Sequence, residues 1–405
     1  MKKILIVGSG ISGLSSAYFL RNKYKITILE KNNYIGGHTH THTLHESGKK
    51  YQYDSGFIVF NNKNYPNFIN LINKLKIDYQ LSEMSFSVVN NKYNYEWSGR
   101  SLKTIFSLKN IVSLKYLKLL YDIIRFSKIC GIELYDQSLT VQKFLKTHKF
   151  SKEFSNLYFY PMCSSIWSSN LKDIKNYNAK FVINFFRNHG LHNIISKRPI
   201  WYTIKNGSKS YIEKITKHKN IKLILDSKVI LVDQNKKIVK TNNRKIIKYD
   251  HIILANHSNQ IKKILKNQND KQKKLLKSVK YQSNKIIIHS DEKMMPKKKS
   301  NWASWNFNNN NKKLLLTYWM NLLQNLKCKK NIFVTLNSKK INRNKIIKKI
   351  TYEHPIFNKS KDEIEILNYN AQGFNNTWFA GAWLGYGFHE DGVNSALKIK
   401  ELIND

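Results

Sequence analysis

Residues 36–45 read GGHTHTHTLH, and the spacing of their histidines could serve a metal-binding strand. In an extended segment alternate side chains point to the same face, so His38, His40 and His42 would present three imidazoles on one side. The residues between them are threonines, which favour a strand, and the stretch itself contains no acidic or cysteine ligand. The pattern alone leaves a metal site and an ordinary strand open, and the preceding residues decide between them.

A glycine-rich loop lies ahead of the histidines. Residues 8–13, GSGISG, form a complete G-x-G-x-x-G between an apolar run at 2–7 and apolar residues with helical spacing at 14–20. Such glycines permit a tight turn, let a pyrophosphate approach the helix N-terminus, and let the helix pack closely on the strand. A second apolar run, 25–29, ends in Glu30, where an acid accepts hydrogen bonds from ribose hydroxyls. The sequence therefore predicts a dinucleotide site rather than a secretory signal, and the acid disfavours NADP.

The composition is globular, with 41% hydrophobic residues in 405, a length that suits two domains. The formal charge is +44, but the lysines are spread along the chain without a nucleic-acid motif, so no specific nucleic acid is expected. Three dispersed cysteines imply no disulfide framework. No apolar run reaches the roughly 18 residues that span a bilayer. We expect a cytoplasmic protein, with a peripheral position at the inner face of an anionic membrane as the alternative.

The segment after the ribose acid, KNNYIGGHTHT, resembles the diglycine segment of FAD enzymes in the flavin amine oxidase superfamily. Further matching stretches include DSGFIVFNNKNYPNF, PMCSSIW, NGSKSYIEKI and TWFAGAWLGYGFHEDGVNSAL. The chain is thus similar to a bacterial branch of that superfamily whose members are described as NAD/FAD-binding or FAD-dependent proteins. The resemblance implies FAD as the cofactor and an α/β fold, in which a Rossmann-like FAD-binding domain accompanies a discontinuous substrate domain of mixed sheet plus helices.

The domain boundaries follow from where the FAD segments fall. The FAD-binding domain is expected in residues 1–60, 198–257 and 370–405, and the substrate domain in 61–197 and 258–369. Helical spacing at 65–81, 102–130 and 139–159, with strand-like runs at 285–289, 314–320 and 332–336, predicts a helical cap over a β-sheet floor.

The resemblance also implies a set of cofactor contacts. His38 stands where many superfamily members carry an arginine near the phosphates, which favours that neighbourhood over strand packing or a metal. Val229 would pair its backbone with adenine, and a helix beginning near Gly392 would face the flavin N1/O2 edge. For Asp391 a simple helix N-cap is the alternative. The full set is Gly8, Ser9, Gly10, Ile11, Ser12, Gly13, Glu30, Gly36, Gly37, His38, Phe57, Val229, Ala255, Asn256, Gly381, Glu390, Asp391, Gly392 and Val393.

Aromatic residues are the candidates for the substrate pocket, because flat apolar walls exclude water and hold a hydride donor in place. We expect Trp305, Tyr318, Tyr386 and Phe388 to line it. The predicted enzyme is an FAD-dependent oxidoreductase that accepts a hydride from a C–C or C–N bond. A fatty acyl lipid is the leading substrate, because members of the branch are often encoded beside cyclopropane-fatty-acid-synthase-like proteins, and an amine is the runner-up.

Two other classes of function stay open. One is a flavin-dependent isomerase, in which FAD assists a rearrangement without net oxidation. The other is a non-catalytic protein of the same fold that binds an anionic membrane. Residues 102–130 mix large apolar residues with lysines, which is typical of an amphipathic lid and, as an alternative, of a helix that lies on a membrane.

Overall fold

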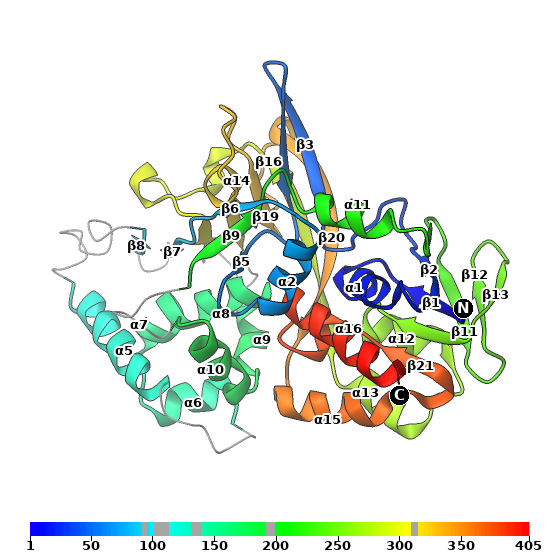
Figure 1. Ribbon diagram of the computed structural model, residues 1–405. Coiled ribbons are helices and arrows are strands. Elements are labelled where there is room, and N and C mark those ends of the chain that lie inside the picture. Colours follow the sequence, from blue (N-terminus) through cyan, green and yellow to red (C-terminus); the bar gives the residue numbers. More distant parts are fainter. Residues whose placement is uncertain (91–94, 101–112, 131–138, 192–198, 309–314, 405) are drawn as a thin grey trace.

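The computed structural model describes residues 1–404 except 91–94, 101–112, 131–138, 192–198 and 309–314. Two lobes lie side by side in Figure 1, one around β1 and α1, the other around α5 and α10. The first lobe contains a parallel five-stranded sheet of order β10-β2-β1-β14-β21, whose strands come from three distant parts of the chain. Its strands are β1 (Lys3–Val7), β2 (Lys25–Leu29), β10 (Ile221–Ile224), β14 (His251–Leu254) and β21 (Thr377–Phe379).

Burial on both faces explains why most residues of these strands are apolar. Helix α1 (Ile11–Leu20) is itself apolar on most sides, and its Leu14 and Ala17 are fully buried. Helix α16 (His389–Asn404) packs against it so closely that a Cβ at Gly392 would lie 2.6 Å from Ile11 Cγ2. This helix begins at His389, three residues before the predicted start.

A second sheet, of order β13-β12-β11-β15, flanks the parallel sheet. Within it, β11 and β12 pair antiparallel as a hairpin. The surrounding helices complete this lobe. The strands are β11 (Val229–Asp233), β12 (Ile238–Thr241), β13 (Ile246–Lys248) and β15 (Leu265–Lys266), and the helices are α11 (Lys209–Thr216), α12 (Ser258–Ile264), α13 (Asp270–Lys277) and α15 (Lys361–Ala371).

The floor of the other lobe is a seven-stranded sheet of order β20-β16-β19-β18-β17-β7-β8. The runs at 285–289 and 332–336 lie in strands, as predicted. Of the run at 314–320, residues 316–319 form a strand, residue 320 begins a helix, and residue 314 lies outside the described part. Two small sheets, β5-β9-β6 and the projecting hairpin β3-β4, adjoin it (Figure 1). The strands are β3 (Thr41–Glu46), β4 (Lys49–Asp54), β5 (Phe60–Asn61), β6 (Tyr79–Leu81), β7 (Phe86–Asn90), β8 (Tyr95–Ser98), β9 (Trp201–Ile204), β16 (Lys280–His289), β17 (Trp305–Asn308), β18 (Leu316–Trp319), β19 (Phe333–Leu336) and β20 (Ile346–Ile356).

Helices cover that floor. Two expected helices are shorter than their patterns: 65–81 is helical only to Lys74, because Lys76 adopts a φ of 52°, and 139–159 is interrupted where Lys149 adopts a φ of 51°. Of the pattern at 102–130, residues 101–112 lie outside the described part. The helices are α2 (Pro66–Lys74), α5 (Leu114–Cys130), α6 (Val141–Thr147), α7 (Lys152–Phe154), α8 (Tyr160–Trp167), α9 (Leu171–Lys175), α10 (Ala179–Asn188) and α14 (Met320–Leu323), with a π-helical segment at Ser155–Phe159.

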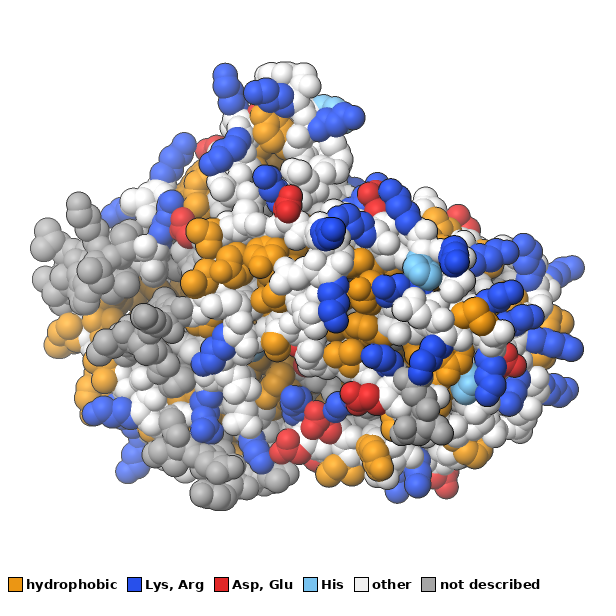
Figure 2. All heavy atoms as spheres, viewed as in Figure 1, with side chains coloured by type: hydrophobic (Ala, Val, Ile, Leu, Met, Phe, Trp, Pro, Cys, Tyr) orange, Lys and Arg blue, Asp and Glu red, His pale blue; other side chains and the backbone are white. Residues whose placement is uncertain are grey.

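The surface in Figure 2 carries lysine and arginine side chains over the whole visible face rather than in one stripe. Among the described helices, none combines the length and apolar character required to cross a membrane.

Candidate active site

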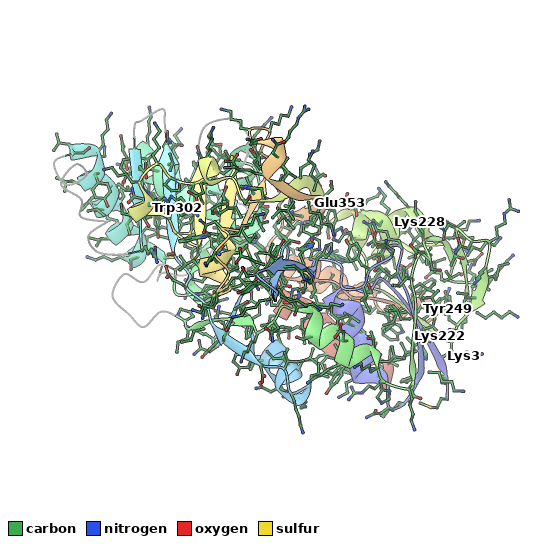
Figure 3. The ribbon with its side chains drawn as sticks, turned by 90° about the horizontal axis from the view of Figure 1, so that it is seen from above. Lys3, Lys222, Lys228, Tyr249, Trp302 and Glu353 are labelled. Carbon is green, nitrogen blue, oxygen red and sulfur yellow. The ribbon has the colours of Figure 1, made fainter. Side chains whose placement is uncertain are left out.

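A cavity of about 1860 Å³ runs between the two lobes. Single ligand pockets usually measure about 300–1,000 Å³, so this one has room for a dinucleotide and a second molecule. We call its two parts the nucleotide end, lined by Gly8–Ser12, Glu30 and Val229, and the apolar arm, lined by Trp97, α5 and α8. Figure 3 shows Glu353 between the lobe that carries Lys228 and the lobe that carries Trp302.

The glycines of the loop have separate physical roles. Gly8 has a φ of 103°, which favours glycine, and a Cβ at Gly13 would lie 2.0 Å from Gly8 O. A Cβ at Gly10 would have no neighbouring atom within 4 Å, so this position is open toward the cavity. Gly8 and Gly13 therefore shape the loop, while Gly10 leaves the backbone accessible to a ligand.

The predicted ribose acid is part of a polar network that holds the loop. Glu30 Oε2 accepts hydrogen bonds from Ser9 N at 3.0 Å and from Ser9 Oγ at 2.6 Å, and Glu30 Oε1 accepts from Asn32 N at 3.0 Å. Ser9 Oγ in turn accepts from Gly36 N at 3.2 Å. The network joins the glycine loop, the end of β2 and the diglycine segment, and it fixes the Glu30 carboxylate in the cavity wall.

The nucleotide end suits a dinucleotide in its charge and in its unpaired acceptors. Lys31, Lys228 and Lys263 line it with exposed side chains, which provide positive charge for phosphates. Asn256 Oδ1 and Asn259 Oδ1 are buried in the same wall and have no hydrogen-bond partner. Because buried acceptors are normally satisfied, these two atoms fit a ligand that brings donors to this wall.

The histidines of the opening stretch separate in the structure. His38 lines the cavity and lies near Tyr352 and His354, with ring centroids 4.7 and 5.4 Å apart. His40 stacks on Tyr34 at 4.3 Å and its Nδ1 lies 3.2 Å from Tyr352 Oη, but it does not line the cavity. Burial and the neighbouring histidines hold the pKa of His38 well below its usual value, so its ring is neutral at pH 7. No three histidine, cysteine or acidic side chains in the described residues are arranged to hold a metal ion.

Several lining residues near His38 were missed in the sequence. Tyr352 and His354 reach the cavity from β20, where alternation places both on one face, and His257 follows β14. His257 Nδ1 lies 3.4 Å from Glu353 Oε2, a contact that lowers the pKa of Glu353 to about 2. The two-residue period of the stretch YEHPIF was the available signal for Tyr352 and His354.

A buried aromatic pair marks the middle of the cavity. The rings of Phe57 and His389 stack with centroids 3.4 Å apart. His389 Nε2 lies 3.0 Å from Thr39 Oγ1 and 3.1 Å from Tyr211 Oη, and burial lowers the pKa of His389 to about 3. Neutral His389 and neighbouring Phe388 therefore form the cavity wall at the start of α16.

The next four residues of α16, all predicted cofactor contacts, do not line the cavity. Glu390 accepts hydrogen bonds from Phe68 N at 2.8 Å and caps the N-terminus of α2. Asp391 accepts from Phe388 N at 2.9 Å, and burial raises its pKa to about 6. Gly392 packs on α1, and Val393 is fully buried in the core. Because the helix begins at His389, its first residue faces the cavity and these four face neighbouring helices and turns.

The other predicted cofactor contacts lie as follows. Gly13 lies behind the loop, and its contact with Gly8 O gives it a structural role. The structure brings the remaining residues together in the cavity wall: Gly8, Ser9, Gly10, Ile11, Ser12, Glu30, Gly36, Gly37, His38, Phe57, Val229, Ala255, Asn256 and Gly381.

Three of the four predicted pocket aromatics line the cavity. Trp305 and Tyr318 meet edge to face with centroids 4.9 Å apart, and the buried Trp305 Nε1 has no partner. Phe388 also lines it. Tyr386 does not, because its ring packs on Phe181 at 4.8 Å, behind the wall.

The apolar arm was not identified from the sequence. The inner face of α5 contributes Leu119, Leu120 and Ile123, and Met162 and Ile166 of α8 lie in the same lining. In sequence these residues have the spacing of ordinary core positions, so periodicity alone does not separate a cavity wall from a packed core.

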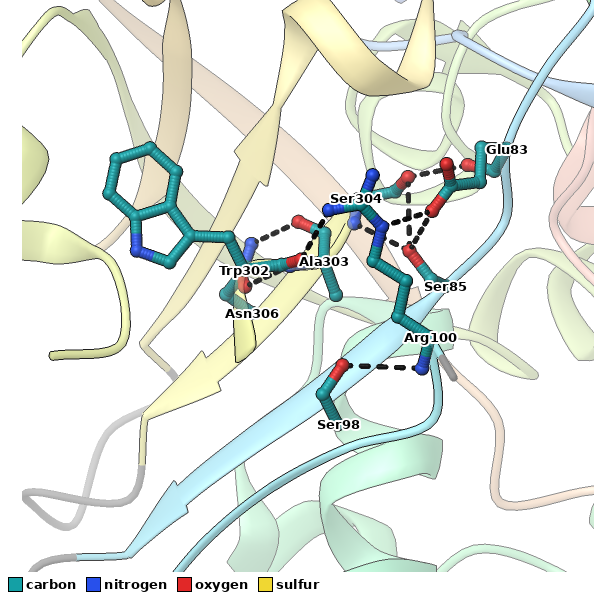
Figure 4. Close-up of polar contacts among 8 residues, drawn as sticks. All are labelled: Glu83, Ser85, Ser98, Arg100, Trp302, Ala303, Ser304 and Asn306. Carbon is teal, nitrogen blue, oxygen red and sulfur yellow. Dashed lines mark hydrogen bonds and ion pairs between the residues drawn. The ribbon is translucent and has the colours of Figure 1, made fainter. Parts of the chain in front are cut away.

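A polar network braces one side of the arm (Figure 4). Arg100 Nε lies 3.1 Å from Glu83 Oε1, which also accepts from Ser85 Oγ at 2.9 Å. Ser304 N donates to Ser85 Oγ at 3.0 Å, and Arg100 Nη1 donates to Trp302 O at 3.4 Å. Since the ion pair is partly exposed, its contribution to stability is small, but the bonds tie β7 and β8 to the segment before β17. The network thereby positions the wall that carries Trp305.

The part of the chain that contains the glycine loop is similar to known proteins in sequence. The model of a NAD(P)-binding Rossmann-like domain matches residues 6–75. A 1-hydroxycarotenoid 3,4-desaturase of Flavobacterium sp. (strain P99-3) is 29% identical over 158 residues, 38% of this chain. The chain covers only 27% of the length of this curated relative.

Solved structures match over the whole chain. Cyclohexylamine oxidase from Brevibacterium oxydans IH-35A superposes with a TM-score of 0.70 at 13% identity, covering 100% of both chains. A CLA-producing fatty acid isomerase from P. acnes gives 0.68 at 12%, covering 100% of this chain and 98% of that one. Reduced UDP-galactopyranose mutase gives 0.69 at 15%, covering 100% and 94%.

These matches agree on the nucleotide-binding domain and on the fold of the whole chain. The chain has a Rossmann-like nucleotide-binding domain. More specifically, its fold is shared with solved amine oxidases, as the sequence predicted. The neighbours confirm the predicted fold class, while the oxidoreductase activity and FAD stay predictions that the proposed function takes up.

Proposed function

We propose that the protein is an FAD-dependent oxidoreductase that removes a hydride from a long apolar substrate, with a fatty acyl lipid as the leading candidate. The observation that carries the proposal is the single cavity in which a dinucleotide end continues into an apolar arm. The βαβ unit around the glycine loop alone would hold only one of the two nucleotide halves of a dinucleotide. The cavity extends beyond that unit, where β11 and α16 line it, and this greater length suits FAD.

The residues that would hold FAD are those of the nucleotide end. The backbone of the glycine loop would face its phosphates, Glu30 would accept from its ribose, and Asn256 Oδ1 would gain a donor. When bound, FAD supplies a two-electron acceptor for a hydride. The protein contributes binding, orientation and exclusion of water.

The arm favours an apolar chain over an amine. Its described lining is mostly aliphatic and aromatic, and the acids of the described cavity lining, Glu30 and Glu353, both lie toward the nucleotide end. An alkylammonium group would therefore find no carboxylate in the arm. Desolvating such a cation without a partner is unfavourable, whereas a methylene chain gains about 0.8 kcal/mol for each buried CH₂.

His189 is a candidate proton acceptor at the junction of the two parts. Oxidation of a saturated C–C bond releases a proton together with the hydride. His189 lines the cavity, and its Nδ1 lies 3.0 Å from Phe185 O, which can only accept; Nε2 is therefore the unprotonated nitrogen. Burial lowers the pKa of His189 to about 4, so the ring is neutral at pH 7 and, as a weak base, would hold the proton only transiently.

The test is spectroscopic. The purified protein should carry flavin bands, release FAD on heating, and lose its flavin absorbance when mixed anaerobically with acyl lipids. Loss of absorbance with amines alone would replace the acyl lipid by an amine. Conversion of an acyl lipid without consumption of an electron acceptor would indicate an isomerase. A colourless protein that takes up no added FAD would contradict the proposed function.

A further inference from the structure

Helix α5 is apolar on two opposite sides. Its inner side lines the arm, as described above. Its outer side exposes Leu114, Leu117, Tyr121 and Ile124, which are 84%, 47%, 62% and 51% accessible. The spacing of three, four and three residues places them in one stripe along the helix. A soluble helix normally presents a polar face to water, so this outer stripe requires an explanation.

The charges beside the stripe have one sign. Lys115, Lys118 and Lys128 are exposed on α5. The acid of this helix, Asp122, is 1% exposed and is satisfied inside, where it pairs with Arg125 Nη1 at 2.5 Å and accepts from Ser151 N at 2.9 Å. The outer face of α5 is therefore apolar and positive, without a compensating acid on the same face.

Helix α15 shows that exposed apolar residues alone do not make such a face. It exposes Ile366 and Tyr369, 63% and 74% accessible, at a spacing of three. Its acids reach the surface, and Glu365 lies 3.8 Å from Lys361 Nζ and 3.4 Å from Lys398 Nζ. The apolar pair on α15 thus has acids and lysines beside it, whereas the described residues of α5 flank its stripe with basic side chains and no exposed acid.

We propose that the outer face of α5 docks on an anionic lipid membrane. The apolar stripe inserts at the boundary between headgroups and acyl chains, and the lysines contact anionic headgroups. Ile124 is half exposed and also lines the cavity, so docking places the wall of the arm against the bilayer. Figure 2 shows hydrophobic side chains along the edge of the molecule where Figure 1 places α5. This inference goes beyond the proposed function, and its test requires no turnover.

The first experiment measures cosedimentation of the full chain with phosphatidylcholine vesicles, with and without phosphatidylglycerol. Binding is expected only with the anionic lipid and should decrease at high salt, because exposed charges are screened. Lys115→Gln with Lys118→Gln should weaken binding about 25-fold, since each lysine near the surface contributes about fivefold. The control, Lys236→Gln with Lys240→Gln, removes two exposed lysines from the other lobe and should retain binding.

A second pair of variants tests the stripe. Leu117→Ser with Tyr121→Ser should reduce binding at least tenfold at unchanged thermal stability, and Ile366→Ser with Tyr369→Ser on α15 should not. Equal losses in both lysine variants would assign binding to the overall charge and overturn the proposal. So would unchanged binding in the α5 serine variant, or no binding to anionic vesicles. A dimer that dissociates with the α5 substitutions would assign the stripe to a second copy of the chain instead.

Discussion

The two parts of the cavity are built on different principles. At the nucleotide end, backbone groups and short polar side chains make directed contacts, as in the bonds of Ser9 to Glu30 and to Gly36. In the apolar arm, side chains such as Leu119 and Met162 come from separate helices and form few directed bonds. Ligand binding at the nucleotide end should therefore depend on the position of single atoms, whereas binding in the arm should depend on the volume and shape of the space.

The largest effect should follow a methyl group at the nucleotide end. Gly10→Ala adds a Cβ that meets no protein atom within 4 Å, so the apo chain should fold normally. The methyl group projects where a ligand approaches the backbone, and FAD affinity should fall about 100-fold. Titration of the apo protein with FAD, followed by fluorescence, measures the loss, and the melting temperature without FAD is the control. Unchanged affinity would mean that the loop does not hold the cofactor.

Replacing His189, where the two parts of the cavity meet, should reduce turnover by a similar factor without reducing FAD affinity. His189→Gln keeps a donor for Phe185 O and removes the proton acceptor, so turnover of the acyl substrate should fall about 100-fold. FAD affinity should stay the same. If the variant loses FAD instead, the role of His189 is to support the nucleotide end.

The arm should respond to volume. Ile123→Trp fills part of the lining of α5, and kcat/KM for long chains should fall about tenfold while short chains lose less. The matched variant Ile366→Trp, on the exposed face of α15, should change neither. Equal losses for all chain lengths would contradict a chain-binding arm.

The smallest effect is a pH dependence of stability. Burial lowers the pKa of His389 from about 6.5 to about 3, so below pH 6.5 the unfolded chain takes up a proton that the folded chain excludes. The free energy of unfolding should therefore decrease as the pH falls from 6.5 toward 3. His389→Phe should reduce this slope by about 1.4 kcal/mol per pH unit near pH 5.

Urea unfolding of the apo protein between pH 7 and pH 5 measures that slope. The control is Ile366→Phe on the exposed face of α15, which leaves every histidine in place and should leave the slope as it is. An unchanged slope in the His389 variant would mean that other buried histidines, such as His354, account for the loss of stability in acid.

Sequence reasoning placed residues in the cavity wall best where they lie close together in the chain. The glycine loop, Glu30 and the diglycine lie within 30 residues of one another, and their roles depend on backbone geometry that residue types reveal. It was less successful at the C-terminal helix. A start near Gly392 would aim Asp391 and Glu390 at the cavity, but the helix begins at His389 and turns both residues toward other partners.

By itself, the sequence determined the nucleotide end, because G-x-G-x-x-G and a strand-terminal acid encode turn, helix N-terminus and acceptor within one βαβ unit. Only the tertiary structure decided the rest. His38 lies beside His354 in the cavity wall, because β20 brings residues from more than 300 positions away. Likewise Leu119 lines a cavity while Phe144 is buried in the core, although both are apolar residues in amphipathic helices. The hydrophobic effect depends on the apolar area that is buried and has no preferred direction, so the sequence does not distinguish core residues from cavity residues. Only the packing of the folded chain decides which apolar side chains line a cavity.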